Sequence, residues 1–238
     1  MATFVLLHGG NHGGWGFKWL APELRRRGHE VHTPTLTGHG DRIHLQPADL
    51  TMETHIVDVA NVIHYEDLND VVLVGHSMGG VTIPLVAERM KDRIRRVVWL
   101  AAVVLADGES IAENYMAPSE WVERAFAPLA QGKPPDQDLL LEAFIQDGTS
   151  EQKAFVKARL GGGTQALLTE KGDLARFLAL GLPTGYIRAI RDQSLAPDLC
   201  RAMAARLPGA RYAEVDAGHE LFITAPEATA DALEAMAR

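Results

Sequence analysis

One short stretch, residues 70–83 (DVVLVGHSMGGVTI), constrains the fold of this 238-residue chain more than any other. It begins as a continuous apolar run, turns at a Gly-His-Ser-Met-Gly segment and continues as the start of a predicted helix. A strand that reverses into a helix so quickly strains the backbone at the turn, and Gly75 and Gly79 let neighbouring backbone pass close by. The pattern predicts that Ser77 stands at the tip of a buried strand with its Oγ exposed, which is typical of a nucleophilic serine.

Short apolar runs alternate with helical patterns on both sides of this stretch. The predicted strands are residues 4–7, 30–34, 70–74, 94–102, 184–190 and 210–215, and the predicted helices are residues 17–27, 54–66, the segment ending near 90, 197–206 and 227–238. Strands that alternate with helices favour a parallel sheet. We therefore predict an α/β fold with a mostly parallel sheet of about six strands and helices on both faces.

The alternation stops between residues 107 and 181. Helical patterns, a proline pair and the triple glycine 161–163 occur there without a strong strand. Bulky apolar side chains recur in this part of the chain, which argues against a disordered linker. We expect a helical lid at 107–181, inserted before the penultimate strand of a single domain whose core is residues 1–106 and 182–238.

Net charge and composition limit the classes of molecule that the chain is expected to bind. The chain has 23 Lys and Arg against 31 Asp and Glu, a net charge of −8, which argues against nucleic acid or an anionic membrane as a partner. Cys200 is the only cysteine, so an intrachain disulfide is excluded. The N-terminal apolar run is too short for a signal peptide, and no run reaches membrane-spanning length. We expect a cytoplasmic, soluble monomer or homodimer with a small-molecule substrate.

A nucleophilic serine needs a base, and histidine is the usual one. In a parallel sheet, ligands sit at the carboxyl ends of the strands, so the base should follow a strand. His219 follows the last predicted strand and has a glycine before it, which permits a tight loop. His39 and His44, after the second strand, are candidates to line a pocket instead.

The third member of such a triad is a carboxylate that orients the histidine. Asp192 follows the strand that ends near Ile190, 27 residues before His219, and we favour it. Asp107, after the preceding strand, stays open as an alternative, although its Ala-Asp-Gly-Glu setting is also a turn signature. Asp216 is a further carboxylate near His219, and its position at the end of a strand indicates a turn residue.

Two backbone N–H groups are needed to stabilise the oxyanion that forms when the serine attacks. We expect one from Met78, directly after the nucleophile, and one from Gly10 in the loop after the first strand. Pro84 lies inside the predicted nucleophile helix and should leave one carbonyl without its helical partner.

Several segments together resemble one family, the small α/β-hydrolases that include plant methyl-ester esterases, hydroxynitrile lyases, and bacterial esterases and carbamate or pyrethroid hydrolases. The matching segments are His8-Gly-Gly-Asn-His-Gly-Gly-Trp15, Gly28-His-Glu-Val-His-Thr-Pro34, Gly75-His-Ser-Met-Gly-Gly80 and Gly218-His219. The resemblance covers nearly the whole chain and is weak only in the predicted lid. It implies the α/β-hydrolase fold, an acyl-enzyme at Ser77, Asp192 as the acid and a hydrophobic, often aromatic, pocket under the lid. We expect Asn11, His12, Trp121 and Phe126 to line that pocket.

Departures from the family pattern separate its branches. Hydroxynitrile lyases of this family use a threonine in the first loop and a lysine directly after the catalytic histidine, where this chain has Gly9 and Glu220. A carboxylate at that point would repel cyanide. Haloalkane dehalogenases resemble this fold but carry an aspartate at the position of Ser77, so the serine excludes that branch.

We therefore predict a serine carboxylic-ester hydrolase acting on a small hydrophobic ester. The alternatives are a carbamate or amide hydrolase with the same triad, a lyase and a non-catalytic ligand receptor. We expect neither a metal nor an organic cofactor, because the sequence has no phosphate-binding glycine loop followed by lysine and no clustered His/Cys ligand set.

Overall fold

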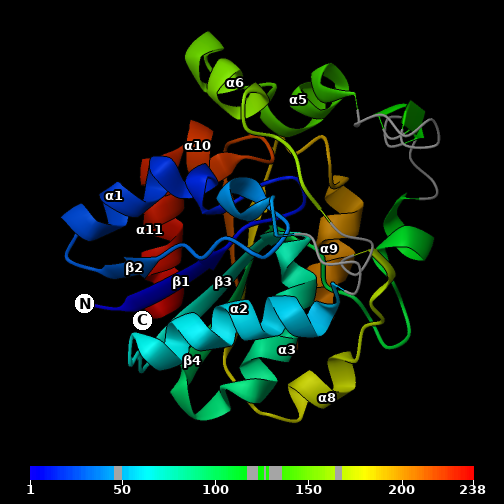
Figure 1. The fold of residues 1–238 in the computed structure, drawn as a ribbon. Helices are drawn as coiled ribbons and strands as arrows, with labels where there is room; N and C mark the ends of the chain where they lie inside the picture. The colour runs from blue at the N-terminus through cyan, green and yellow to red at the C-terminus, as the bar shows by residue number, and fades with distance from the viewer. Residues whose placement is uncertain (46–49, 117–122, 126, 129–135, 164–167) are drawn as a thin grey trace.

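A six-stranded sheet forms the centre of the computed structural model, which describes residues 1–45, 50–116, 123–125, 127–128, 136–163 and 168–238 (Figure 1). The strands are β1 (Thr3–Leu7), β2 (Glu30–His32), β3 (Val71–Ser77), β4 (Ile94–Ala102), β5 (Thr184–Ala189) and β6 (Arg211–Val215). Their order is β2-β1-β3-β4-β5-β6, and every neighbouring pair is parallel. The predicted α/β fold is confirmed, including the number of strands.

Helices cover both faces of this sheet (Figure 1). One face carries α1 (Leu20–Arg26) and α11 (Pro226–Ala237), and the other carries α2 (Met52–Tyr65), α3 (Gly79–Arg89) and α9 (Pro197–Ala205). Side chains alternate between faces along a strand. In β1, Phe4 and Leu6 therefore pack with α1 and α11, whereas Val5 and Leu7 pack with α2 and α3.

The insertion lies between β4 and β5, before the penultimate strand as predicted. It contains η4 (Ala112–Met116), α5 (Gln137–Ile145), α6 (Ser150–Lys157) and α8 (Leu174–Leu178). Figure 1 shows α5 and α6 together at one end of the molecule, whereas α8 packs beside α3. The loops between the sheet and its helices contain η1 (Gly14–Lys18), η2 (Gly40–Arg42), η3 (Lys91–Arg93) and α10 (Leu221–Thr224).

Pro84 lies inside α3, and the carbonyl that it frees has another partner. A proline at this position has no N–H to donate to the carbonyl oxygen of Gly80, four residues earlier. The indole N–H of Trp99, a fully buried side chain of β4, donates to that oxygen at 3.1 Å. In an ordinary helix this carbonyl oxygen would already accept a hydrogen bond within the helix. Here it is available to Trp99, and the bond attaches α3 to β4 of the sheet.

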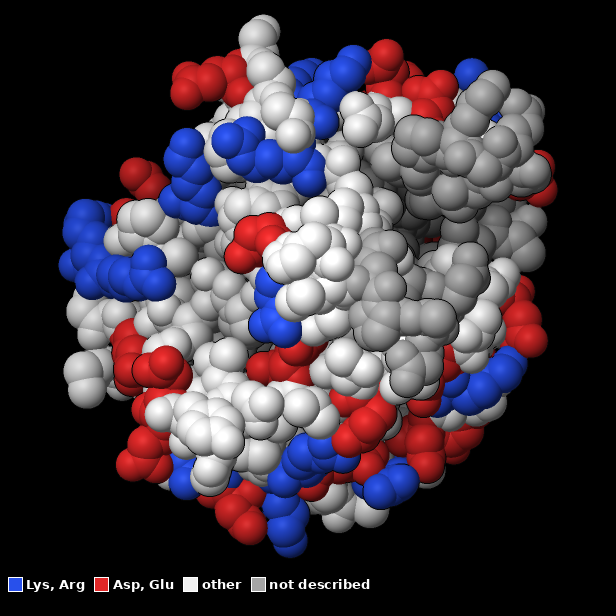
Figure 2. Space-filling model, viewed as in Figure 1, with Lys and Arg blue, Asp and Glu red and all other residues white. Residues whose placement is uncertain are grey.

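The described surface is charged and mixed. On the face shown in Figure 2, acidic and basic side chains are interspersed. Among the described residues, no helix combines the length and the apolar character needed to cross a membrane.

The bond from Trp99 to Gly80 predicts a specific stability effect. Trp99→Phe should leave the Gly80 carbonyl buried without a partner, which costs about 1–3 kcal/mol beyond the loss of packing. In a Pro84→Ala background, residue 84 has an N–H that can donate to Gly80 in the usual helical pattern. The cost of Trp99→Phe, measured by urea unfolding, should therefore be smaller in that background. Equal costs in the two backgrounds would contradict this account of Pro84.

Candidate active site

The turn after β3 presents Ser77 at the carboxyl edge of the sheet. Ser77 ends β3, α3 begins at Gly79, and the φ of Ser77 is +52°. This left-handed region is unfavourable for residues other than glycine. A Cβ on Gly75 would lie 2.8 Å from the Gly79 carbonyl oxygen, and a Cβ on Gly79 would lie 2.7 Å from the His8 carbonyl oxygen. The turn therefore needs both glycines, for the close backbone contacts that the sequence predicted.

His219 lies between Ser77 and Asp192. Its Nε2 is 2.9 Å from Ser77 Oγ, and its Nδ1 is 2.7 Å from Asp192 Oδ2. A carboxylate only accepts hydrogen bonds, so Nδ1 carries the proton and Nε2 is free to accept one from the serine hydroxyl. Burial alone would lower the pKa of His219, but Asp192, with a smaller contribution from Glu220, outweighs it and raises the pKa.

The Asp192 carboxylate is fixed from behind and is almost fully buried. Its Oδ1 accepts hydrogen bonds from the backbone N–H groups of Ser194 at 2.7 Å and Leu195 at 2.9 Å, which leaves Oδ2 for His219. The two rival carboxylates lie elsewhere. Asp107 is exposed and accepts from the N–H of Ala175 in the insertion, and exposed Asp216 pairs with Arg191. Of the three aspartates weighed from the sequence, only Asp192 contacts His219.

The loop after β1 lies against the nucleophile. A Cβ on Gly9 would lie 2.7 Å from Ser77 Cβ, and one on Gly10 would lie 2.5 Å from Met78 Sδ. In the described part of the chain, neither the Gly10 N–H nor the Met78 N–H donates to a protein acceptor. An oxyanion requires two such amide donors, and these two N–H groups remain the candidates.

His8 holds this loop in place. Its Nδ1 donates to the Gly9 carbonyl oxygen at 2.8 Å, and its Nε2 accepts from the Leu36 N–H at 3.1 Å. The C=O and N–H of a trans peptide point in opposite directions, so this bond directs the Gly10 N–H away from His8. Burial lowers the pKa of His8 well below its usual value, which keeps Nε2 an acceptor at neutral pH.

The turn between α5 and α6 is hydrogen-bonded to the loops that carry His219 and Asp192. The Asp147 carboxylate accepts from the N–H of Gly218, directly before His219, at 2.7 Å. The neighbouring Gln146 side chain donates to the Arg191 carbonyl oxygen, directly before Asp192, at 2.6 Å. These contacts place part of the insertion behind the site as support, in addition to any role in covering it.

The α5 helix also contributes a ring to the site. Phe144 lies with its centroid 5.5 Å from that of His219 and 6.0 Å from that of His12. Its carbonyl oxygen accepts from the N–H of Glu220 at 3.1 Å. An apolar ring beside the base excludes water and favours an apolar substrate group.

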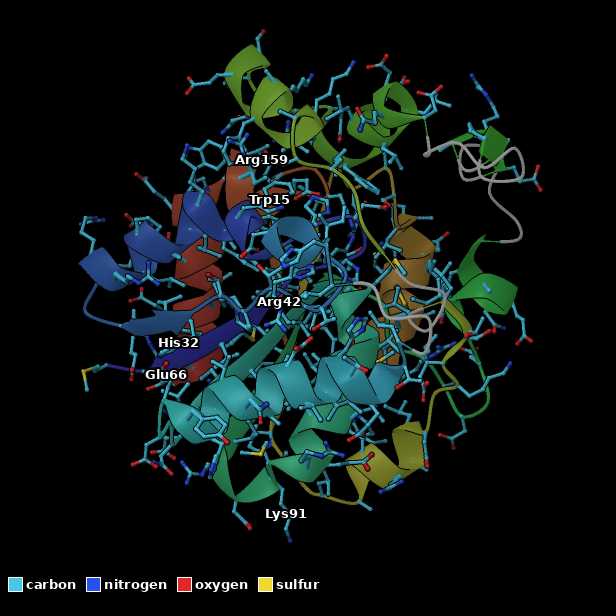
Figure 3. The ribbon with its side chains drawn as sticks, in the orientation of Figure 1. Trp15, His32, Arg42, Glu66, Lys91 and Arg159 are labelled. Carbon is cyan, nitrogen blue, oxygen red and sulfur yellow. The ribbon has the colours of Figure 1, made fainter. Side chains whose placement is uncertain are left out.

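The α6 helix attaches to the far side of the first loop. Phe155 contacts Trp15 and Trp19 edge to face, with centroids 5.7 and 4.9 Å apart, and the Arg159 guanidinium lies 3.9 Å from the Phe155 ring. Figure 3 shows Trp15 and Arg159 next to each other where α6 meets the first loop.

The expected pocket residues occupy different environments. Asn11 is half-buried with a φ of +61°, and its carbonyl oxygen accepts from the N–H of Gly161 in the insertion at 2.9 Å. His12 is buried and stacks on Trp15 at a centroid distance of 5.0 Å. Trp121 and Phe126 lie outside the described residues.

Histidines are concentrated around the site, and six of the ten are buried. They are His8, His12, His39, His55, His76 and His219. Burial lowers the pKa of His39 to about 4 and holds the pKa of His76 well below its usual value. His44, the other expected pocket residue, is exposed. Within the described ranges, no group of three or more His, Cys, Asp or Glu side chains could hold a metal ion.

Two features of the site were missed by sequence reasoning. The support from Asp147 depends on how the insertion folds back over the sheet, and no motif marks it. Glu220 was noted only as a departure from the lyase pattern, whereas its carboxylate lies beside His12, 208 residues away in the chain. Only the three-dimensional fold brings such pairs together.

The fold and this arrangement of serine, histidine and aspartate define an α/β-hydrolase, and the chain belongs to the alpha/beta hydrolase family, whose model matches residues 4–232. The chain is similar to a carbendazim hydrolyzing esterase of Nocardioides, with 51% identity over 111 residues that cover 47% of this chain and 46% of that esterase. The match therefore spans less than half of that relative's length.

Two further relatives are similar over nearly the whole chain. A pyrethroid hydrolase of Sphingobium wenxiniae is 28% identical over 98% of this chain and 86% of its own. The structure of an extracellular alpha/beta-hydrolase from a Paenibacillus species superposes with a TM-score of 0.88 and 28% identity, covering 100% of both chains. That protein is described as sharing structural and functional homology with tobacco salicylic acid binding protein 2.

The contacts of the two aspartates predict opposite outcomes for matched variants. Asp192→Asn should lower kcat for an activated ester by about 10⁴-fold, because the amide no longer fixes the histidine tautomer. Asp107→Asn should leave kcat nearly unchanged, because Asp107 bonds only to the insertion. The measurement is steady-state kinetics on both variants at neutral pH. A large loss in Asp107→Asn with a small loss in Asp192→Asn would reverse the assignment.

Proposed function

We propose that the chain is a serine carboxylic-ester hydrolase that acts through an acyl-enzyme on a small hydrophobic ester. The observation that carries the proposal is the continuous hydrogen-bonded line from Ser77 Oγ through His219 to Asp192, with distances of 2.9 and 2.7 Å. The base lies within reach of the nucleophile, and a third group orients the base.

In the first half of the reaction, Ser77 Oγ attacks the ester carbonyl carbon while His219 Nε2 takes the hydroxyl proton. The carbonyl electron pair moves onto oxygen, and the N–H groups of Gly10 and Met78 stabilise the resulting charge. The intermediate then collapses, the bond to the alcohol breaks and His219 gives its proton to the leaving oxygen. The acyl group remains on Ser77.

In the second half, water replaces the alcohol. His219 takes a proton from the water as it attacks the acyl carbon, and the same two N–H groups stabilise the second oxyanion. Collapse returns the proton to Ser77 Oγ and releases the carboxylic acid. The raised pKa of His219 supports this role, since the imidazolium must persist between the two proton transfers.

The surroundings support an ester with an apolar acid or alcohol part. The Phe144 ring lies beside His219, and Met78 packs over Gly10. The relatives named as an esterase and as a pyrethroid hydrolase support hydrolysis as the reaction class. Glu220 argues against the lyase reaction, because a carboxylate next to His219 disfavours a cyanide anion.

The proposal predicts that all hydrolysis depends on Ser77. With p-nitrophenyl butyrate, the wild-type protein should give a burst or steady release of nitrophenol, and a fluorophosphonate should label Ser77 covalently. Ser77→Ala should lose about 10⁶-fold in kcat and all labelling. Ser150→Ala, at an exposed serine that begins α6, is the matched control and should behave as wild type. Retained turnover in Ser77→Ala would rule out the serine mechanism.

A matched substrate set tests the bond that is cleaved. p-Nitrophenyl butyrate, a p-nitrophenyl N-alkylcarbamate and p-nitrobutyranilide differ in the carbonyl group, and mandelonitrile tests for lyase activity. We expect the ester to have the highest kcat/KM, because the nitrogen of the carbamate makes its carbonyl carbon less electrophilic and the anilide has a poorer leaving group. A higher kcat/KM for the carbamate or the anilide would favour that alternative. Aldehyde release from mandelonitrile would favour a lyase, and labelling without turnover of any substrate would favour a receptor.

A further inference from the structure

A second carboxylate–histidine pair lies beside the triad. His12 Nε2 is 2.8 Å from Glu220 Oε1, and the two side chains are 2% and 0% exposed. The other ring nitrogen of His12, Nδ1, is 2.8 Å from the Gly10 carbonyl oxygen. Glu220 directly follows His219, and His12 belongs to the loop that carries Gly10. The pair therefore joins the loop of the base to the loop of an expected oxyanion donor.

The partners of His12 determine how many protons the pair holds. A carbonyl oxygen only accepts, so Nδ1 must carry a hydrogen. A lone pair on Nε2 facing a carboxylate oxygen at 2.8 Å would be repulsive, so one further proton must lie between His12 and Glu220. The Nε2–H is not well aligned with Oε1, and the contact is an ion pair more than a hydrogen bond.

The backbone of the oxyanion loop has a left-handed residue directly before His12. Asn11, between Gly10 and His12, has a φ of +61°, and its carbonyl oxygen accepts from the Gly161 N–H. A left-handed asparagine persists only when its neighbours hold it there. The bond from His12 Nδ1 to Gly10 closes this turn from one side, and the insertion closes it from the other.

We propose that His12 and Glu220 are positioning residues that form a buried ion pair and thereby hold the oxyanion loop against the histidine loop. The inference rests on the proposed function, since it assigns the pair a part in esterase catalysis. The pair does not touch the reacting atoms in this account. His12 holds the carbonyl of the peptide between Gly10 and Asn11. It thereby limits how the preceding peptide, which carries the Gly10 N–H, can turn relative to the place where negative charge develops in the transition state.

The charged state of His12 follows from its surroundings. The titratable groups around it are Glu220, His219, His76, His8 and His39. Burial alone would lower the pKa of His12, but the Glu220 carboxylate outweighs it and raises the pKa above its usual value. His8, His39 and His76, which have no carboxylate beside them, have lowered pKa values.

The direction of the pH effect follows from the raised pKa. Because the folded-state pKa of His12 lies above its unfolded value, the interaction is fully present below the unfolded value, near 6.5. It is lost as the pH rises through the folded-state pKa of His12. The deprotonated Nε2 then faces the Glu220 carboxylate, and the loop is pushed from its place. Activity should therefore fall as the pH rises above the ordinary histidine pKa.

Glu220→Gln removes the negative charge of the side chain and keeps nearly the same shape. The amide N–H of glutamine can donate to Nε2 of a neutral His12, so Nδ1 keeps its bond to Gly10 without the extra proton. We expect kcat at neutral pH within a few-fold of wild type and a weaker loss of activity at alkaline pH. The fall of kcat at acid pH, where His219 becomes protonated, should move to lower pH, because Glu220 contributes to the raised pKa of His219. A purely structural role for Glu220 would leave both limbs of the pH profile in place.

His12→Phe removes the donor to Gly10. It should lower kcat by up to about 100-fold with little change in KM, at every pH. Because a buried carboxylate without its partner is destabilising, the same substitution is also made together with Glu220→Gln. The double variant should show the same loss of kcat as His12→Phe and should lack the alkaline limb. His64→Phe, at an exposed histidine on α2, is the matched control. Wild-type kcat in a folded double variant would overturn the proposal.

A measurement without substrate distinguishes this proposal from the function on which it rests. In Ser77→Ala protein, proton NMR of the imidazole groups should show two ring N–H signals of His12 at pH values up to the ordinary histidine pKa, both absent in the His12→Phe variant. One of the two should disappear as the pH rises. A single His12 N–H signal at and below the ordinary histidine pKa would overturn the ion pair even if the chain is an esterase. Two signals in a chain that hydrolyses no ester would instead refute the proposed function.

Discussion

The left-handed backbone at Ser77 is the constraint on which the rest of the structure depends. Such a conformation costs about 1–3 kcal/mol and persists only where the surrounding structure holds it. Here it is held by a strand and a helix that meet within two residues, with glycines where the backbones touch. Because the sheet is parallel, the loops after β1, β5 and β6 end on the same edge. They bring Gly10, Asp192 and His219 around one hydroxyl group.

The insertion belongs to this framework as much as the sheet does. In its α5–α6 turn, Asp147 accepts a hydrogen bond from the N–H before His219, and Gln146 donates one to the carbonyl oxygen before Asp192. Its glycine segment bonds to Asn11 in the first loop. A change in the insertion therefore reaches the geometry of the base and of the oxyanion loop, as well as any surface that contacts substrate. Specificity and alignment are physically linked in this molecule.

Much of the fold and of the candidate site could be predicted from the sequence, for physical reasons that are local. The Gly-His-Ser-Met-Gly turn is encoded within five residues, and β1 and β3 are short, continuous apolar runs that are followed directly by residues of the site. Asp192 and His219 could be placed because they come directly after strands. Asp192 was favoured over Asp107 from its spacing to His219 and the turn-like setting of Asp107, and the family resemblance added support for that choice.

Other contacts could not be predicted, because they depend on tertiary packing. Pro84 indicates that one helix carbonyl has no helical partner. The sequence does not show that the indole N–H of Trp99, on β4, donates to this carbonyl. His12 and Glu220 are each visible in a loop, and only the convergence of the two loops makes them a pair. Asp147 reads as an ordinary turn residue between two helices until the insertion folds back over the sheet.

The buried histidines have a consequence for the acid stability of the whole fold. His8, His39 and His76 have folded-state pKa values below their ordinary values, so the unfolded chain binds protons that the folded chain does not. Their contribution to stability is present above the unfolded pKa and is lost as the pH falls below it. Between the unfolded-state and folded-state pKa, such a group lowers the free energy of unfolding by about 1.4 kcal/mol for each pH unit. His12 and His219, whose pKa values are raised, act in the opposite direction. The response of the fold to acid therefore depends on the balance between buried histidines that have a carboxylate beside them and buried histidines that have none.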